Sequence, residues 1–109
     1  MEQFTLTVKF TAKKENQEQF KQELIKLFDI INEEENLVSA VIHQNIQKPK
    51  EFLVYEIWND TVEHFLNVHL KKPYAQEWDQ LLLDMDVLRE PSIYVPFGKY
   101  GKENNNASL

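Results

Sequence analysis

The sequence predicts a single α+β domain in which helices cover one face of an antiparallel sheet. Three observations carry this prediction. Segments with the two-residue alternation of β-strands occur near both ends of the chain and in its middle. Segments with apolar residues at helical spacing separate them. The chain has 109 residues and no cysteine, which is enough to bury one core without disulfides or metal clips.

The N-terminal part predicts one strand followed by one long helix. Residues 4–10 alternate between apolar and polar side chains, as in a half-buried strand. Apolar residues then recur on one helical face from about residue 17 to residue 34. Asn16 and Gln19 resemble a capping box at the start of this helix. The acidic run 33–35 is interpreted as its solvated end.

The middle of the chain predicts a β-hairpin. Residues 37–46 and 51–58 are rich in β-branched and aromatic side chains, and the turn 47–50 between them is centred on Pro49. By simple alternation, Leu37, Val41 and His43 share one face of the first of these strands. Glu56 shares a face of the second strand with Val54 and Trp58.

Two helices and a strand are expected after the hairpin. Asp60 with Glu63 resembles a second capping box, which would start a short helix that reaches about Val68. Pro73 suits the first turn of the next helix. That helix carries an apolar stripe, which consists of Tyr74, Trp78, Leu81, Leu82 and Met85.

A last strand is expected over residues 92–97, at an edge of the sheet because Pro91 and Pro96 lack amide donors. Residues 1–98 then form one domain, and residues 99–109 a disordered tail. The resulting order of strand, helix, two strands, helices and strand is the split β-α-β arrangement of ferredoxin-like folds.

Apolar residues on both faces of the hairpin strands exceed what one helix layer can cover. A sheet with helices on one side normally has polar residues on the other. We therefore expect a second layer over the free face, and a homodimer packed sheet to sheet is its simplest source.

Composition excludes several function classes. The net charge of −6 argues against a nucleic-acid partner, and no segment has the apolar length of a membrane span. No signal peptide precedes the domain, so the cytoplasm is expected. The absence of cysteine excludes thiol chemistry, and with two glycines no phosphate-binding loop is recognisable. His64 and His69 are five residues apart, not four as in a helical metal pair, so no metal ligands are expected.

Four segments in a fixed order resemble the antibiotic biosynthesis monooxygenase family. They are residues 36–43 (NLVSAVIH), the turn at Pro49, residues 55–58 (YEIW) and residues 69–74 (HLKKPY). The resemblance spans about residues 4–97 and implies a dimeric α+β barrel of ferredoxin-like subunits. It also implies oxidation of a quinol or phenolic substrate by O2 without a cofactor. The haem-degrading branch uses an asparagine in its first strand, which residues 7–9 of this chain lack.

Five residues are candidates for the site, and four of them have a structural alternative. His69, which resembles the helix histidine of the family, is a candidate general base or oxyanion partner, or an exposed polar side chain. Glu56 is a second catalytic candidate, or a buried partner of another group. Trp58 and Tyr74 are candidate ring contacts for the substrate, or core residues. His43 is a candidate substrate contact.

The leading hypothesis is a cofactor-independent monooxygenase that acts on a quinol or phenolic aromatic molecule. A non-catalytic, dimeric ligand-binding or stress-related module is the first alternative, and an isomerase or lyase acting on a small carbonyl compound is the second. Consumption of O2 distinguishes the first reading from the other two.

Overall fold

Four antiparallel strands form one sheet in the order β2-β3-β1-β4. The structure is a computed structural model that describes residues 2–102, so most of the tail predicted to be disordered, residues 99–109, lies outside the described residues. The strands are listed by their bounds: β1 Phe4–Thr11, β2 Leu37–Gln44, β3 Glu51–Trp58 and β4 Leu88–Tyr94.

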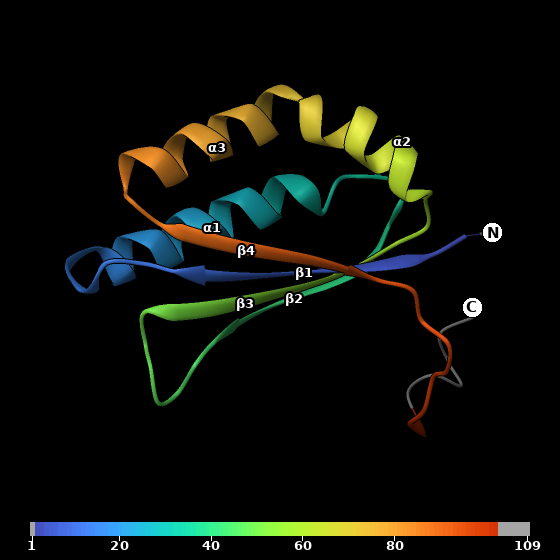
Figure 1. The fold of residues 1–109 in the computed structure, drawn as a ribbon, viewed down its shortest axis with the longest axis horizontal. Helices are drawn as coiled ribbons and strands as arrows, with labels where there is room; N and C mark the ends of the chain where they lie inside the picture. Colours follow the sequence, from blue (N-terminus) through green and yellow to red (C-terminus); the bar gives the residue numbers. More distant parts are fainter. Residues whose placement is uncertain (1, 103–109) are drawn as a thin grey trace.

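Three α-helices lie on one side of this sheet (Figure 1). They are α1 (Gln17–Ile31), α2 (Val62–Asn67) and α3 (Pro73–Asp84). Two 3-10 turns, η1 (Lys14–Asn16) and η2 (His69–Lys71), precede α1 and α3. The α+β class and the ferredoxin-like order predicted from the sequence are therefore confirmed.

The core lies between the helices and the inner face of the sheet. Alternate residues of β1 and β3 are buried there, and the stripe of α3 packs against them with Trp78 and Leu82 buried. Phe20 of α1 joins the layers, because its ring lies 5.6 Å from that of Trp78 and 5.2 Å from that of Phe52. Each such buried side chain contributes about 1.5–3 kcal/mol.

Helix α1 ends three residues earlier than predicted, at Ile31. Three successive carboxylates at residues 33–35 would meet the negative end of the helix dipole, which disfavours continuing the helix. The predicted caps are also wrong in detail. Asn16 makes no side-chain capping bond, and at α2 the amide of His64 donates to Thr61 Oγ1 (3.0 Å), so Thr61 and not Asp60 is the cap.

The hairpin was predicted well in β3 and less well in β2. The bounds of β3 agree with the prediction, whereas β2 ends at Gln44, because Asn45 Oδ1 accepts the amides of Gln47 and Lys48 and so begins the turn. A bulge between Leu37 and Ser39 changes the register. Leu37 therefore does not share a face with Val41, as simple alternation predicted, and packs against the core.

Strand β4 runs over Leu88–Tyr94, not over residues 92–97. Pro91 therefore lies inside the strand and not before it. The position is tolerated because β4 is an edge strand that pairs only with β1. The edge placement was predicted correctly, but the predicted bounds of the strand were wrong.

The second face of the sheet carries exposed apolar side chains. Val41, Leu53 and Tyr55 are 49%, 44% and 39% exposed, and no described element covers them (Figure 1). Within residues 2–102, no helix combines the length and apolar character needed to cross a membrane.

Candidate functional site

A cavity of about 590 Å³ lies between the inner face of the sheet and the three α-helices. Its lining is mainly apolar and includes Phe28 of α1 and Phe65 of α2. Such a volume and lining are typical of sites for small organic molecules. Four of the five candidate residues line it: Glu56, Trp58, His69 and Tyr74.

Glu56 is the buried carboxylate of the cavity wall. The alternation of β3 points it inward between Val54 and Trp58, and it is only 5% exposed. Burial raises its pKa to about 7, although the hydrogen bond from Trp58 opposes this shift. Near neutral pH this carboxyl group is therefore balanced between its acid and base forms.

Trp58 belongs to both the core and the site. It is 1% exposed, and its Nε1 donates to Oε1 of Glu56 at 2.8 Å. Its ring centroid lies 5.0 Å from that of Phe65 and 5.1 Å from that of His69. The indole thus fixes the carboxylate while it forms part of the apolar wall.

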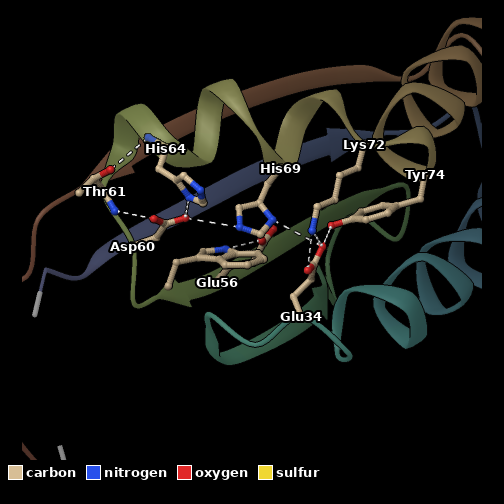
Figure 2. A network of polar contacts seen from close by, with 9 residues as sticks. Glu34, Glu56, Asp60, Thr61, His64, His69, Lys72 and Tyr74 are labelled. Atoms are coloured by element: carbon tan, nitrogen blue, oxygen red, sulfur yellow. Dashed lines mark hydrogen bonds and ion pairs between the residues drawn. The ribbon is translucent and has the colours of Figure 1, made fainter.

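His69 lies in η2, buried between two carboxylates (Figure 2). Its Nδ1 is 3.5 Å from Oε2 of Glu34, and its Nε2 is 3.4 Å from Oδ2 of Asp60. Among residues 2–102, neither ring nitrogen has a hydrogen-bond partner. The imidazole therefore borders the cavity, but its nitrogens face the carboxylates.

Glu34 joins the end of α1 to the start of α3 (Figure 2). Its carboxylate accepts hydrogen bonds from Lys72 Nζ (2.7 and 2.8 Å) and from the hydroxyl of Tyr74 (2.6 Å). Burial alone would raise the pKa of Glu34, but these bonds and the charge of Lys72 outweigh it and lower the pKa. Burial and the neighbouring Glu34 raise the pKa of Tyr74, which therefore stays a neutral phenol.

Asp60 forms the other end of this network (Figure 2). Its Oδ1 accepts the amide of Thr61 at 2.8 Å, and its Oδ2 lies 2.9 Å from Nδ1 of His64. Partial burial would raise the pKa of Asp60, but the bonds from His64 and Thr61 and the nearby histidines lower it. His64, in α2, and His69, in η2, both approach Oδ2, so the five-residue spacing that argued against a metal pair does not keep them apart.

An ion pair joins α3 to β4 at the cavity wall. Arg89 Nη1 lies 2.7 Å from Oδ1 of Asp79, and both residues line the cavity. The two side chains are 41% and 52% exposed, so the pair contributes little to stability. It places a charged pair beside a mainly apolar wall.

His43 is not brought together with the other candidates. It pairs with Leu53 on the exposed face of the sheet, and its Nδ1 lies 3.1 Å from the carbonyl oxygen of Leu53. The cavity lies on the opposite face, where Val54 and Glu56 point. Within this chain, His43 therefore has no contact with the cavity.

Sequence reasoning missed Glu34 and Asp60 as members of the site. Glu34 was interpreted as part of a solvated helix end, yet its side chain is only 14% exposed. Its partner Lys72 lies 38 residues away in the sequence, so no local sequence pattern predicts the contact. For Asp60, the four-residue spacing to His64 was an available signal, since side chains at that spacing meet at a helix start.

Comparisons with known proteins agree with this fold. Among solved structures, the chain is similar to a protein from Deinococcus radiodurans, with 16% identity over 91% of this chain and 97% of that chain and a TM-score of 0.81. It is similar to SnoaB, a cofactor-independent oxygenase from Streptomyces nogalater, with 13% identity, coverage of 94% and 100% and a TM-score of 0.79. A conserved protein from Methanosarcina mazei is 23% identical, with coverage of 89% and 95% and a TM-score of 0.76.

A search of curated proteins finds no significant match. The family model of the antibiotic biosynthesis monooxygenases, however, matches residues 3–81, which include both hairpin strands and most of the cavity wall. This match covers well over half of the chain and agrees with the resemblance carried by the sequence motifs. The chain therefore belongs to the antibiotic biosynthesis monooxygenase family.

Proposed function

We propose that this protein is a cofactor-independent monooxygenase that oxidises a quinol or another phenolic aromatic molecule with O2. The observation that carries the proposal is Glu56, a buried carboxylate with a pKa raised to about 7 in the wall of a mainly apolar cavity. Membership of the monooxygenase family and the similarity in fold to SnoaB, a cofactor-independent oxygenase, support the reaction type.

The chemistry needs little from the protein beyond binding and a proton acceptor. A phenol that loses its proton becomes electron-rich enough to pass an electron to O2. In the balanced reaction, a ring C–H and the O–H become the two carbonyl groups of a quinone. One oxygen atom of O2 forms the new carbonyl and the other leaves as water, so the substrate supplies all four electrons. Burial of the ring in an apolar cavity holds it in place for this reaction.

Glu56 is the group that we propose as the base. Its Oε1 is held by Trp58, and among the described residues no further hydrogen bond occupies this carboxylate. A base with a pKa near the working pH is the most effective for proton transfer. The role of general base predicted for His69 stays a prediction, but the geometry favours Glu56, because both nitrogens of His69 face Glu34 and Asp60.

The aromatic side chains are proposed as ring contacts. Trp58 and Tyr74 line the cavity, and the Tyr74 hydroxyl is already engaged by Glu34, so Tyr74 offers its ring face and not a hydrogen bond. We propose that His69 acts as a positioning residue, since it lies between the two carboxylates that hold this wall in place.

Oxygen uptake tests the proposal. We would measure O2 consumption with a panel of reduced quinols and anthrone-like phenols, against the spontaneous oxidation of each compound. Glu56→Gln keeps the size of the side chain and the acceptor for Trp58, and should lower the rate at least about a hundredfold. Glu77→Gln, on the exposed side of α3, is the matched control and should leave the rate unchanged.

Uptake equal to the background across the panel would contradict the proposal. Conversion of a substrate without O2 would point to an isomerase or lyase. Ligand-dependent stabilisation without any conversion would point to a binding module. A rate that Glu56→Gln leaves unchanged would contradict the role of Glu56 but not the reaction type.

We also propose that two copies pair through the free face of the sheet. The exposed side chains of Val41, Leu53 and Tyr55 on that face favour burial against an apolar surface, and a second copy presents the same one. Sedimentation at micromolar concentration should give a particle of two chains. A species of one-chain mass would contradict this pairing.

A further inference from the structure

Three side chains converge on the side of His69 that faces Asp60. His64 Nδ1 lies 2.9 Å and His69 Nε2 lies 3.4 Å from the same atom, Oδ2 of Asp60, and one donor atom from each residue lies within 4.8 Å of the others. Two imidazoles and a carboxylate are the ligand types that Zn²⁺ and related ions prefer. We propose that these three residues bind a divalent transition-metal ion of the zinc type.

The burial of His69 and the lack of hydrogen-bond partners at its ring nitrogens are a second, independent indication of a ligand. Its side chain is only 7% exposed, and within the described part of the chain neither ring nitrogen has a hydrogen-bond partner. A buried polar group without a partner costs about 1–3 kcal/mol. An ion at Nε2 would satisfy one nitrogen, and Glu34, 3.5 Å from Nδ1, would orient the other. Metal-binding histidines commonly have a carboxylate in that position.

The separation of the donor atoms of Asp60 and His69 suits one shared ion. Two ligands at ~2.0–2.1 Å from a tetrahedral ion lie about 3.3 Å apart. The separation of 3.4 Å between Asp60 and His69 fits this value directly. The shorter distance to His64 is that of a hydrogen bond, and the half-exposed ring of His64 is free to turn and open it.

Asp60 is already oriented for the role. The amide of Thr61 engages Oδ1, which leaves Oδ2 directed at the two histidines (Figure 2). Thr61 is itself fixed, because its hydroxyl caps α2 by accepting the amide of His64. The segment 60–64 therefore sets the positions of two of the three ligands, Asp60 and His64. His69 in η2 supplies the third.

The proposed ion would lie outside the cavity. His69 lines the cavity, but Asp60 and His64 are not among its lining residues. The half-exposed His64 gives the ion access from solvent, and three protein ligands leave at least one position for water. The ion would therefore not lie in the substrate cavity, and metal binding can be tested without any aromatic substrate.

Titration of the tag-free, metal-stripped protein with Co²⁺ and Zn²⁺ tests this site. Co²⁺ should give visible absorption bands at one ion per chain, and Zn²⁺ should displace them and raise the melting temperature. His64→Gln, a change at an exposed position, should weaken binding at least about tenfold, because even the loss of an outer partner of a metal site has that effect. Asp60→Asn should weaken it in the same way.

The third histidine of the chain provides the matched control. His43 is exposed on the opposite face of the sheet, so His43→Gln should leave the binding of both ions unchanged. Absence of binding at millimolar ion concentration would overturn the proposal. So would binding that His64→Gln leaves intact or that His43→Gln abolishes. Circular dichroism of each variant confirms that it is folded.

Discussion

Glu34 and Glu56 are two largely buried carboxylates whose pKa values shift in opposite directions. Glu56 accepts one hydrogen bond, from the neutral indole of Trp58, and burial raises its pKa to about 7. Glu34 accepts bonds from Lys72 and Tyr74, and these lower its pKa in spite of burial. The difference follows from both the deeper burial of Glu56 and the charged and polar partners of Glu34, which together decide the charge of each carboxylate at neutral pH.

The contrast gives the two carboxylates different uses. Glu34 stays charged and ties the end of α1 to Lys72 and Tyr74 at the start of α3. Glu56 can release or accept a proton near neutrality, in the wall of a mainly apolar cavity. The same side-chain type therefore serves as a structural link at one position and as the proposed base at the other.

Of the predicted changes in stability, removal of the charge of Glu56 should be the largest. The pKa of Glu56 rises from 4.5 to about 7 in the folded protein, so the folded state binds the proton more tightly than the unfolded state. Its ionisation therefore costs stability progressively between about pH 4.5 and pH 7. Above pH 7, Glu56→Gln should be more stable than the natural protein by about 3 kcal/mol.

Urea denaturation at pH 8 and pH 4.5 measures this effect. The advantage of Glu56→Gln should be present at pH 8 and largely lost at pH 4.5, where Glu56 is protonated in the folded state and about half-protonated in the unfolded state. Glu77→Gln should follow the natural protein at both values. Equal stabilities at pH 8 would mean that Glu56 ionises without cost and would remove the contrast with Glu34.

Loss of the cation beside Glu34 should lower the stability of the protein, by less than the gain expected for Glu56→Gln. Lys72→Met keeps most of the length of the side chain but removes two hydrogen bonds to a carboxylate that is largely buried. We expect a loss of about 1–2 kcal/mol at pH 7, because the Lys72 side chain is itself one-third exposed. The loss should shrink as the pH falls below about 4.5, where Glu34 becomes protonated.

Lys71→Met is the matched control for this substitution. Lys71 is the exposed neighbour of Lys72, and among the described residues its side chain makes no ion pair. Thermal denaturation at pH 7 and at a pH below the lowered pKa of Glu34 should show a loss only for Lys72→Met, and only at the higher pH. An equal loss for both variants would mean that Glu34 needs no cationic partner.

The sequence was informative where local pattern decides structure. The alternation of β3 predicted its bounds and placed Glu56 on the face of Val54 and Trp58, which is the cavity face. Pro73 and the apolar stripe predicted α3 in the same way. Where a bulge interrupts the pattern, as in β2, simple alternation gave the wrong face for Leu37. In the edge strand β4 the predicted bounds were also wrong.

The polar part of the site was harder to predict, because its contacts join distant segments. Glu34 meets Lys72 and Tyr74 across 38 and 40 residues, and it reaches them only because α1 ends before the acidic run. Nothing in the run 33–35 distinguishes the one carboxylate that becomes buried. The position of His69 between Glu34 and Asp60 likewise depends on how η2 packs over the sheet end.

The most direct test of the contrast is the titration of the two carboxyl groups by carbon-13 NMR of glutamate-labelled protein, with Glu56→Gln and Glu34→Gln to assign the signals. We predict a midpoint near pH 7 for Glu56 and a midpoint below 4.5 for Glu34. If Glu56 titrated near pH 4.5 together with the exposed glutamates, it would carry a charge at neutral pH like any surface residue, and the account of Glu56 as the base of this cavity would be contradicted.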